Sequence, residues 1–180
     1  MNDICTRAVT RAARRGVWRT ALLALLLALG ACAAAPSQPQ LVLHSFSFDG
    51  WSDKWYPETE LIEYSYGDQY RMVRKAARPP EDSLGPQSSV SGPMPVGGFL
   101  YVKWRIKATG EVHEDRVDLR PMLPTDMTRH RLTFVIEGPQ LYVYLVTPTP
   151  KHTTDPPLLK TSESMFHVTY EIYPSNTYNR

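Results

Sequence analysis

The residues best suited to metal binding or acid–base chemistry are five scattered histidines, at positions 44, 113, 130, 152 and 167. Only one has a second candidate ligand nearby, because His113 and Asp115 would project from the same face of a strand. Two ligands without an identifiable third make an incomplete site, and the helical His-Glu-x-x-His spacing is absent. We therefore expect a solvated, charged strand face here and no bound metal.

Nucleophilic catalysis and phosphate binding are not indicated by any motif in the sequence. There is no Gly-x-Ser-x-Gly elbow, and the glycines of residues 85–98 are interrupted by prolines and lack a phosphate-binding fingerprint. No pair of groups is arranged for acid–base catalysis. The sequence therefore predicts a protein that is not an enzyme and needs no cofactor.

Of the two cysteines, Cys32 is the one that follows a basic and then an apolar segment. Five arginines precede an unbroken apolar run, Ala21 to Leu29, and the small residues Gly30 and Ala31 lead into Cys32. This order is typical of a secretory signal. The segment Leu29-Gly30-Ala31-Cys32 resembles a bacterial lipobox, after which lipoprotein signal peptidase cuts. We therefore predict a lipoprotein signal peptide over residues 1–31, and lipidation of Cys32 by a diacylglycerol and an N-acyl chain.

Two other interpretations of this segment are a membrane span, which its length argues against, and ordinary signal cleavage. The apolar run from Ala21 to Ala35 has only 15 residues, whereas a membrane span needs about 20. Cleavage after Ala33 or Ala35 would instead discard Cys32 and release a soluble protein. By resemblance to lipoprotein sorting rules, Ala33 favours the periplasmic face of the outer membrane over the inner membrane.

Removal of residues 1–31 changes the charge of the chain. Five arginines and one aspartate are lost, so the net charge falls from +2 to −2. The basic character expected of a nucleic-acid-binding protein disappears with the signal, and we predict no nucleic-acid partner. No free thiol is left for a disulfide, so burial alone must stabilise a single domain of this size.

From Leu41 onward, apolar and polar residues alternate with a period of two, as is typical of half-buried strands. The strongest case is Phe99 to Lys107, and in residues 59–66 the alternation groups Ile62 with Tyr64 and Tyr66. No segment predicts a helix longer than one turn. We therefore predict an all-β domain over residues 41–180, an antiparallel sandwich or open barrel of about eight strands, after an acylated cysteine and tether at residues 32–40. The expected strands are 41–48, 59–66, 69–74, 99–107, 111–120, 132–136, 141–147 and 164–173.

Two proline-rich segments are predicted to be loops. Residues 76–98 hold five prolines and four glycines, which argues against a hydrogen-bonded ladder. Such a long loop is either an insertion without regular structure or a segment that contacts a partner. Residues 148–162 hold four prolines and predict a second polar loop.

Three aromatic residues, Trp51, Trp55 and Tyr56, crowd the predicted turn after the first strand. Aromatic side chains at a turn can anchor a protein interface or stack on a sugar, because they bring a large area at little entropic cost. The alternative is a plug that closes one end of the sandwich. The interface interpretation makes these three the candidate partner-binding residues.

The lipobox, the run GGFLYVKWRIKATGEVHEDRVDLRP and the segment QLYVYLV together resemble a family of small proteobacterial envelope lipoproteins. Some of its members resemble immunity proteins of type VI secretion lipase effectors. The resemblance implies a periplasmic binding protein, anchored in the membrane by its lipid, that covers the active-site entrance of a secreted phospholipase. The alternative is a structural or assembly lipoprotein of the envelope or of the secretion machinery.

Overall fold

The computed structural model describes residues 39–73, 84–152 and 162–178. They belong to one compact unit, Pro39–Arg180, which is separate from the unit Met1–Gln38. The predicted signal peptide, Cys32 and most of the tether lie outside the described residues. Both sheets and their shared core lie within Pro39–Arg180.

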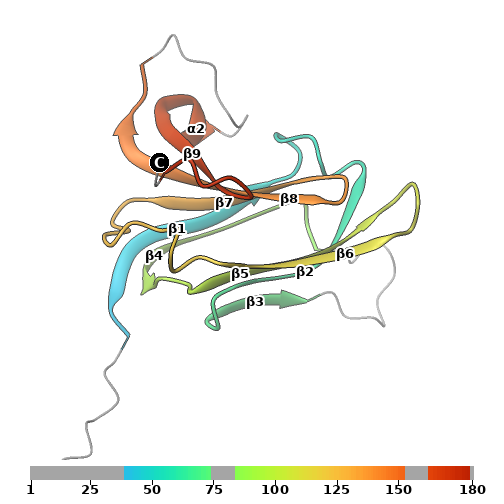
Figure 1. Cartoon of the computed structure of the whole chain (residues 1–180), viewed down its shortest axis with the longest axis horizontal. Helices are drawn as coiled ribbons and strands as arrows, with labels where there is room; N and C mark the ends of the chain where they lie inside the picture. The colour runs from blue at the N-terminus through green and yellow to red at the C-terminus, as the bar shows by residue number, and fades with distance from the viewer. Residues whose placement is uncertain (1–38, 74–83, 153–161, 179–180) are drawn as a thin grey trace, which may run out of the picture. The chain divides into compact units, whose positions relative to one another are not determined.

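The described strands form two sheets packed face to face, so the predicted all-β sandwich is confirmed (Figure 1). Neighbouring strands are antiparallel except β1 and β7, which are parallel. In order across sheet A, the strands are β4 (Gln87–Pro95), β1 (Leu41–Asp49), β7 (Arg131–Glu137), β8 (Gln140–Pro150) and β9 (His167–Tyr173). In order across sheet B, they are β3 (Tyr70–Val73), β2 (Thr59–Tyr66), β5 (Phe99–Ile106) and β6 (Val112–Asp118). One short helix, α2 (Ser162–Phe166), precedes β9.

The core lies between the sheets and is rich in aromatic rings. Strand β5 shows the predicted alternation, with Leu100, Val102 and Trp104 buried. Phe134 of β7 is completely buried, and its ring centre lies 4.7 Å from that of Phe48. This dense packing explains how the domain can be stable without a disulfide.

One face assignment in β2 was wrong. The predicted alternation grouped Ile62 with Tyr64 and Tyr66, but the structure buries Leu61 completely and leaves Ile62 partly exposed. The pairing of β2 with β5 shifts register between Leu61 and Glu63. This bulge inserts one residue, so the strand keeps an apolar side chain inward on both sides of it.

The prediction that residues 76–98 contain no ladder was also wrong. Residues 87–95 form β4, which pairs with β1 along its whole length. Pro93 and Pro95 are tolerated because β4 is an edge strand of sheet A. A proline nitrogen has no hydrogen to donate, and at an edge it can face the side that has no neighbouring strand. Residues 74–83 lie outside the described residues.

The second predicted loop, residues 148–162, is shorter than expected. Strand β8 continues to Pro150, which pairs with His167 of β9, and α2 begins at Ser162. The prolines at 148 and 150 stand where β8 has passed beyond its pairing with β7, so no ladder bond to that strand is lost. Residues 153–161 lie outside the described residues.

A buried hydrogen-bonded pair links the sheets at His44 and Tyr66. His44 Nδ1 lies 2.8 Å from the carbonyl of Val42, and Nε2 lies 2.8 Å from the Tyr66 hydroxyl. We assign the Nδ1 hydrogen to the Val42 bond, so that Tyr66 donates to Nε2. Burial raises the pKa of Tyr66 to about 12, against a smaller lowering by a hydrogen bond from the Gly97 backbone. Burial also raises the pKa of Tyr64.

We expect these tyrosines to make the fold sensitive to alkali. Below pH 10 both the folded and unfolded chains keep the phenolic protons, and stability does not depend on them. From pH 10 to 12 the unfolded chain loses protons that the folded chain retains, so stability falls as pH rises. Titration of Tyr66 alone should lower the free energy of unfolding by about 2 to 3 kcal/mol at pH 12.

Urea unfolding at stepped pH, followed by circular dichroism, measures this loss. Tyr66→Phe is the control, because it lacks the proton that titrates in the unfolded state, and its unfolding free energy should fall less steeply above pH 10. The absolute stability of Tyr66→Phe will differ, since His44 loses its partner, so the slopes are compared. Equal slopes would contradict the role assigned to Tyr66.

Candidate functional site

The turn that follows β1 is fixed by the Asp49 carboxylate. One carboxylate oxygen accepts the N–H groups of Trp51, at 3.1 Å, and Ser52, at 3.0 Å. The other accepts the Ser52 hydroxyl at 2.7 Å. A side chain that bonds the backbone two and three residues later holds a turn in one conformation. The aromatic segment therefore starts from a defined geometry at the end of a buried strand.

The next residue, Gly50, brings the backbone against the ring of Trp55. A Cβ atom at Gly50 would lie 2.8 Å from two ring atoms of Trp55, which is too close for any other residue without a shift. The Gly50 N–H donates to the carbonyl of Pro86 at 2.7 Å. The turn therefore packs on the Trp55 ring and is hydrogen-bonded to the segment that leads into β4.

The three predicted partner-binding residues lie in different environments. Trp55 is only 4 % exposed and packs against Phe48 and Phe134, so it closes one end of the core as the plug interpretation expected. Trp51 is 58 % exposed, and Tyr56 is partly buried. Direct contact with a partner is therefore available to Trp51 and Tyr56, while Trp55 supports them from below.

Lys107, the residue that follows β5, completes the exposed group. The ring centres of Trp51 and Tyr56 are 5.2 Å apart, and Lys107 Nζ lies 4.8 Å from the centre of the Tyr56 ring. The same ammonium donates to the carbonyls of Tyr56, at 2.7 Å, and Pro57, at 3.2 Å. We call Trp51, Tyr56 and Lys107 the Trp51 platform. An exposed aromatic ring beside a fixed cation suits contact with a protein surface.

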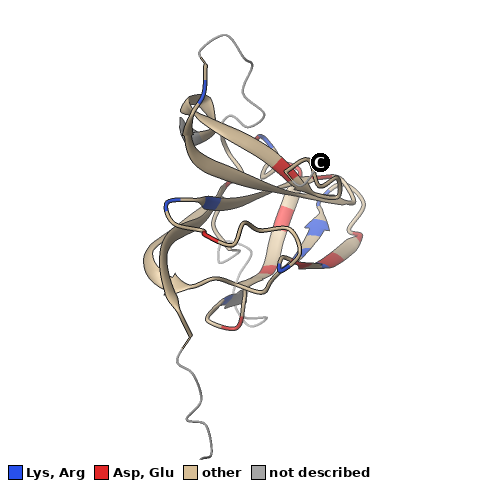
Figure 2. Ribbon diagram, turned by 60° about the vertical axis from the view of Figure 1, so that its left-hand side comes forward, with Lys and Arg blue, Asp and Glu red and all other residues tan. Residues whose placement is uncertain are grey.

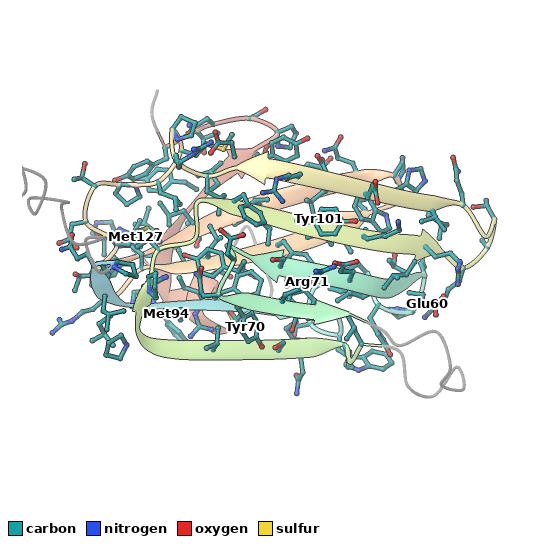
Figure 3. All side chains as sticks on the ribbon, turned by 90° about the horizontal axis from the view of Figure 1, so that it is seen from below. Glu60, Tyr70, Arg71, Met94, Tyr101 and Met127 are labelled. Carbon is teal, nitrogen blue, oxygen red and sulfur yellow. The ribbon has the colours of Figure 1, made fainter. Side chains whose placement is uncertain are left out.

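The outer face of sheet B carries charged side chains, and several of them form ion pairs. Glu63 pairs with Arg71 at 2.7 Å, and Glu60 pairs with Arg105 at 2.6 Å. Glu60, Arg71 and Tyr101 come from β2, β3 and β5 and are labelled on this face in Figure 3. The acidic partners come from β2 and the basic ones from β3 and β5, so the sign changes from strand to strand. Figure 2 colours the basic and acidic positions on the ribbon. Such pairs contribute little stability and are typical of a solvated face.

Glu114 of β6 joins two donors on the same face. The Lys103 ammonium and the Tyr101 hydroxyl each lie 2.8 Å from its carboxylate. The hydrogen bond from Lys103 is the largest cause of the lowered pKa of Glu114, followed by the bond from Tyr101. Burial and the bond to Glu114 raise the pKa of Tyr101 to about 12. Glu114 is therefore ionised and Tyr101 is neutral near neutral pH.

Two shallow depressions at one end of this face, of about 440 and 460 Å³, share Asp68, Phe99 and Arg116. The guanidinium carbon of Arg116 lies 3.4 Å from the centre of the Phe99 ring. Because acidic and basic side chains line both depressions, they indicate no ligand of one particular charge.

His113 and Asp115 differ from the solvated pair expected from the sequence. The His113 ring stacks on Trp104 at 5.7 Å, and Asp115 accepts the Tyr173 hydroxyl at 2.6 Å. Tyr173 belongs to sheet A, so this bond joins the two sheets. Among the described residues, no group of three or more His, Cys, Asp or Glu residues could hold a metal ion.

Comparison with known proteins adds no relative to this picture. No protein-family model, no curated protein and no solved structure matches the chain. Within the described part of the chain, no helix has the length and apolar character needed to cross a membrane.

Sequence reasoning missed one member of the platform. Lys107 is separated from Tyr56 by 51 positions in the chain, and no local signal connects them. The alternation of β5 placed Lys107 on the polar side of the strand, as part of a run with Lys103 and Arg105. Only the antiparallel pairing of β2 with β5, which sets Thr59 beside Ile106, brings Lys107 to the aromatic turn.

Proposed function

We propose that this chain is a lipoprotein anchored in the outer membrane through Cys32, and that its periplasmic domain binds a protein partner through the Trp51 platform. One observation carries the proposal. The Trp51 ring is 58 % exposed, yet the turn that holds it is fixed by Asp49 and packed on buried Trp55. A large aromatic side chain held in place before binding loses little entropy in a complex.

The segment before β4 supports the same surface. Residues 76–98 were the second segment expected to contact a partner, and their described part meets the aromatic turn. The carbonyl of Pro86 accepts the Gly50 N–H at 2.7 Å, and Leu84 packs against the core. Two segments proposed for binding, separated in the sequence, are therefore neighbours at one end of the domain.

We propose a secreted phospholipase effector as the partner, with this protein as its immunity inhibitor. The support is the resemblance of the lipobox and of the strands around residues 97–121 and 140–146 to envelope lipoproteins of that kind. An inhibitor of this type acts by covering the entrance to the lipase active site. The platform offers a contact surface for that purpose without chemistry of its own.

Replacing Trp51 by alanine is expected to weaken the complex about 30-fold, the effect of truncating a central aromatic anchor. The measurement uses residues 33–180 as bait for envelope extract that contains secreted effectors. A captured phospholipase is then titrated with wild-type and Trp51→Ala domains, and both affinity and inhibition are recorded. Loss of both together supports the platform as the inhibitory surface.

Met165→Ala is the matched control, because Met165 is another exposed apolar side chain, 51 % accessible, on a different element. It should leave affinity and inhibition unchanged. Equal affinity of the Trp51→Ala and wild-type domains would reject the platform. Capture of only resident envelope components would instead favour the structural or assembly role.

A further inference from the structure

A basic pocket lies at one end of sheet A, away from the Trp51 platform. It has a volume of about 310 Å³, and Ser45, Arg131, Thr147 and His167 line it from four adjacent strands, β1, β7, β8 and β9. Ser45 and Arg131 are register partners in the parallel pair, so their side chains stand side by side. The pocket is therefore built by the same strands that carry the core on their other face.

Arg129 brings a second guanidinium to this pocket from the turn before β7. Its φ is 61°, in the left-handed region that a residue with a side chain rarely occupies. Its N–H donates to the carbonyl of Leu43 at 2.7 Å, and the Ser45 N–H bonds the carbonyl of His130 at 3.0 Å. These two bonds fasten the turn to β1 and hold Arg129 at the rim in an unusual conformation.

The charged side chains among the described residues of the pocket are basic. Arg129, Arg131 and His167 line it, and none of the described residues that line it is acidic. Guanidinium groups are suited to phosphate because their planar fork gives two parallel, charge-assisted hydrogen bonds. Hydroxyls beside them, as at Ser45, add a donor for a phosphate oxygen. The chemistry therefore favours a phosphate group as the ligand.

Exposed apolar side chains flank the basic pocket on two sides. On the β1 side, Leu41 and Leu43 are 60 % and 50 % exposed and share the outward face with Ser45. On the β9 side, Phe166 is 64 % exposed and directly precedes His167. Its carbonyl accepts the N–H of Lys151, a further basic residue, at 2.8 Å. Basic groups combined with exposed apolar side chains are typical of proteins that bind a lipid surface.

We propose that this pocket binds the phosphate of an anionic phospholipid headgroup, while Leu41, Leu43 and Phe166 contact the adjoining acyl region. The surface includes the beginning of β1, the strand into which the predicted tether leads. The Trp51 platform begins after the other end of β1, and none of its residues lines the pocket. The inference uses residues that partner binding does not use, and it rests on the proposed anchor only for access to a membrane.

Sedimentation with lipid vesicles tests the proposal. Residues 33–180, which contain both sheets and the entire core but lack the acylated cysteine, are mixed with phosphatidylcholine vesicles, with or without phosphatidylglycerol. We expect binding to the anionic vesicles only. The double variant Arg129→Gln with Arg131→Gln should bind about 30-fold more weakly, because each basic residue lost near an anionic surface weakens binding by about five- to sixfold.

A matched double variant separates the pocket from a general charge effect. Lys103→Gln with Arg105→Gln removes the same charge from the outer face of sheet B and should leave vesicle binding within about threefold. Circular dichroism checks that each variant is folded. If the Arg129 and Arg131 double variant unfolds, the single variants Arg129→Gln and Leu43→Ser, both at exposed positions, are tested in its place. Equal losses in the two double variants, or no binding to anionic vesicles, would overturn the proposal.

Inorganic phosphate distinguishes a lipid headgroup from a soluble phosphate. It should compete with vesicles only weakly, because it lacks the acyl region that the leucines contact. Tight binding of phosphate alone, lost in the Arg129 and Arg131 variant and without any affinity for vesicles, would overturn the headgroup assignment. Partner affinity should be unchanged in this variant, and vesicle binding should be unchanged in Trp51→Ala, so the two proposals can fail separately.

Discussion

Replacing Cys32 by serine is expected to abolish incorporation of fatty acid into the protein. The thiol sulfur is the atom that would carry the diacylglyceryl group, and a serine hydroxyl is a much weaker nucleophile under the same conditions. Without at least two acyl chains the exported domain loses stable anchoring, since a single chain binds membranes only marginally. Growth with an alkyne-labelled fatty acid, followed by coupling to a fluorophore, measures the incorporation directly.

Cys5 offers the matched control, because it is the other cysteine of the chain and lies within the predicted signal peptide. Cys5→Ser should retain full labelling. The intact mass of the wild-type protein should correspond to a chain that begins at Cys32 and carries lipid. A mass that begins after Ala33 or Ala35, without lipid, would refute the lipoprotein assignment and leave an ordinary secreted protein.

Replacing Phe134 by alanine is expected to lower the free energy of unfolding by about 3 to 5 kcal/mol. Phe134 is completely buried, and its ring centre lies 4.7 Å from Phe48 and 5.9 Å from Trp55. Truncation removes ring contacts with β1 and with Trp55, and the rigid surroundings cannot close the cavity. Urea unfolding followed by tryptophan fluorescence reports this loss.

Phe166→Ala makes the same chemical change at a ring that is 64 % exposed, and it should alter stability by no more than about 0.5 kcal/mol. A loss below about 1 kcal/mol at Phe134 would show that the core repacks around the missing ring. In that case the position of Trp55 would not depend on Phe134. Contacts other than the one with Phe134 would then have to hold Trp55 beneath the Trp51 platform.

Part of the site could be expected from the sequence alone. The aromatic residues after β1 were predicted to be either interface anchors or a plug, and the structure buries one tryptophan in the core and leaves its neighbour at the surface. Trp55 is buried and Trp51 is exposed because Gly50 allows the backbone to pass directly over the Trp55 ring. The difference between Trp55 and Trp51 depends on a single close contact between backbone and ring, and such a contact produces no periodic pattern in the sequence.

The all-β class could be predicted from the sequence, because a period of two is a local property of each strand. The export signal and the lipidation of Cys32 remain predictions from the sequence, which depend on contiguous residues. Only the tertiary structure decided that residues 87–95 are a strand, since Pro93 and Pro95 are compatible with a ladder only at a sheet edge. The meeting of Lys107 with Tyr56, and of Arg131 with Ser45, likewise follows from strand order. Strand order is set by burial of the whole core, which no local pattern encodes.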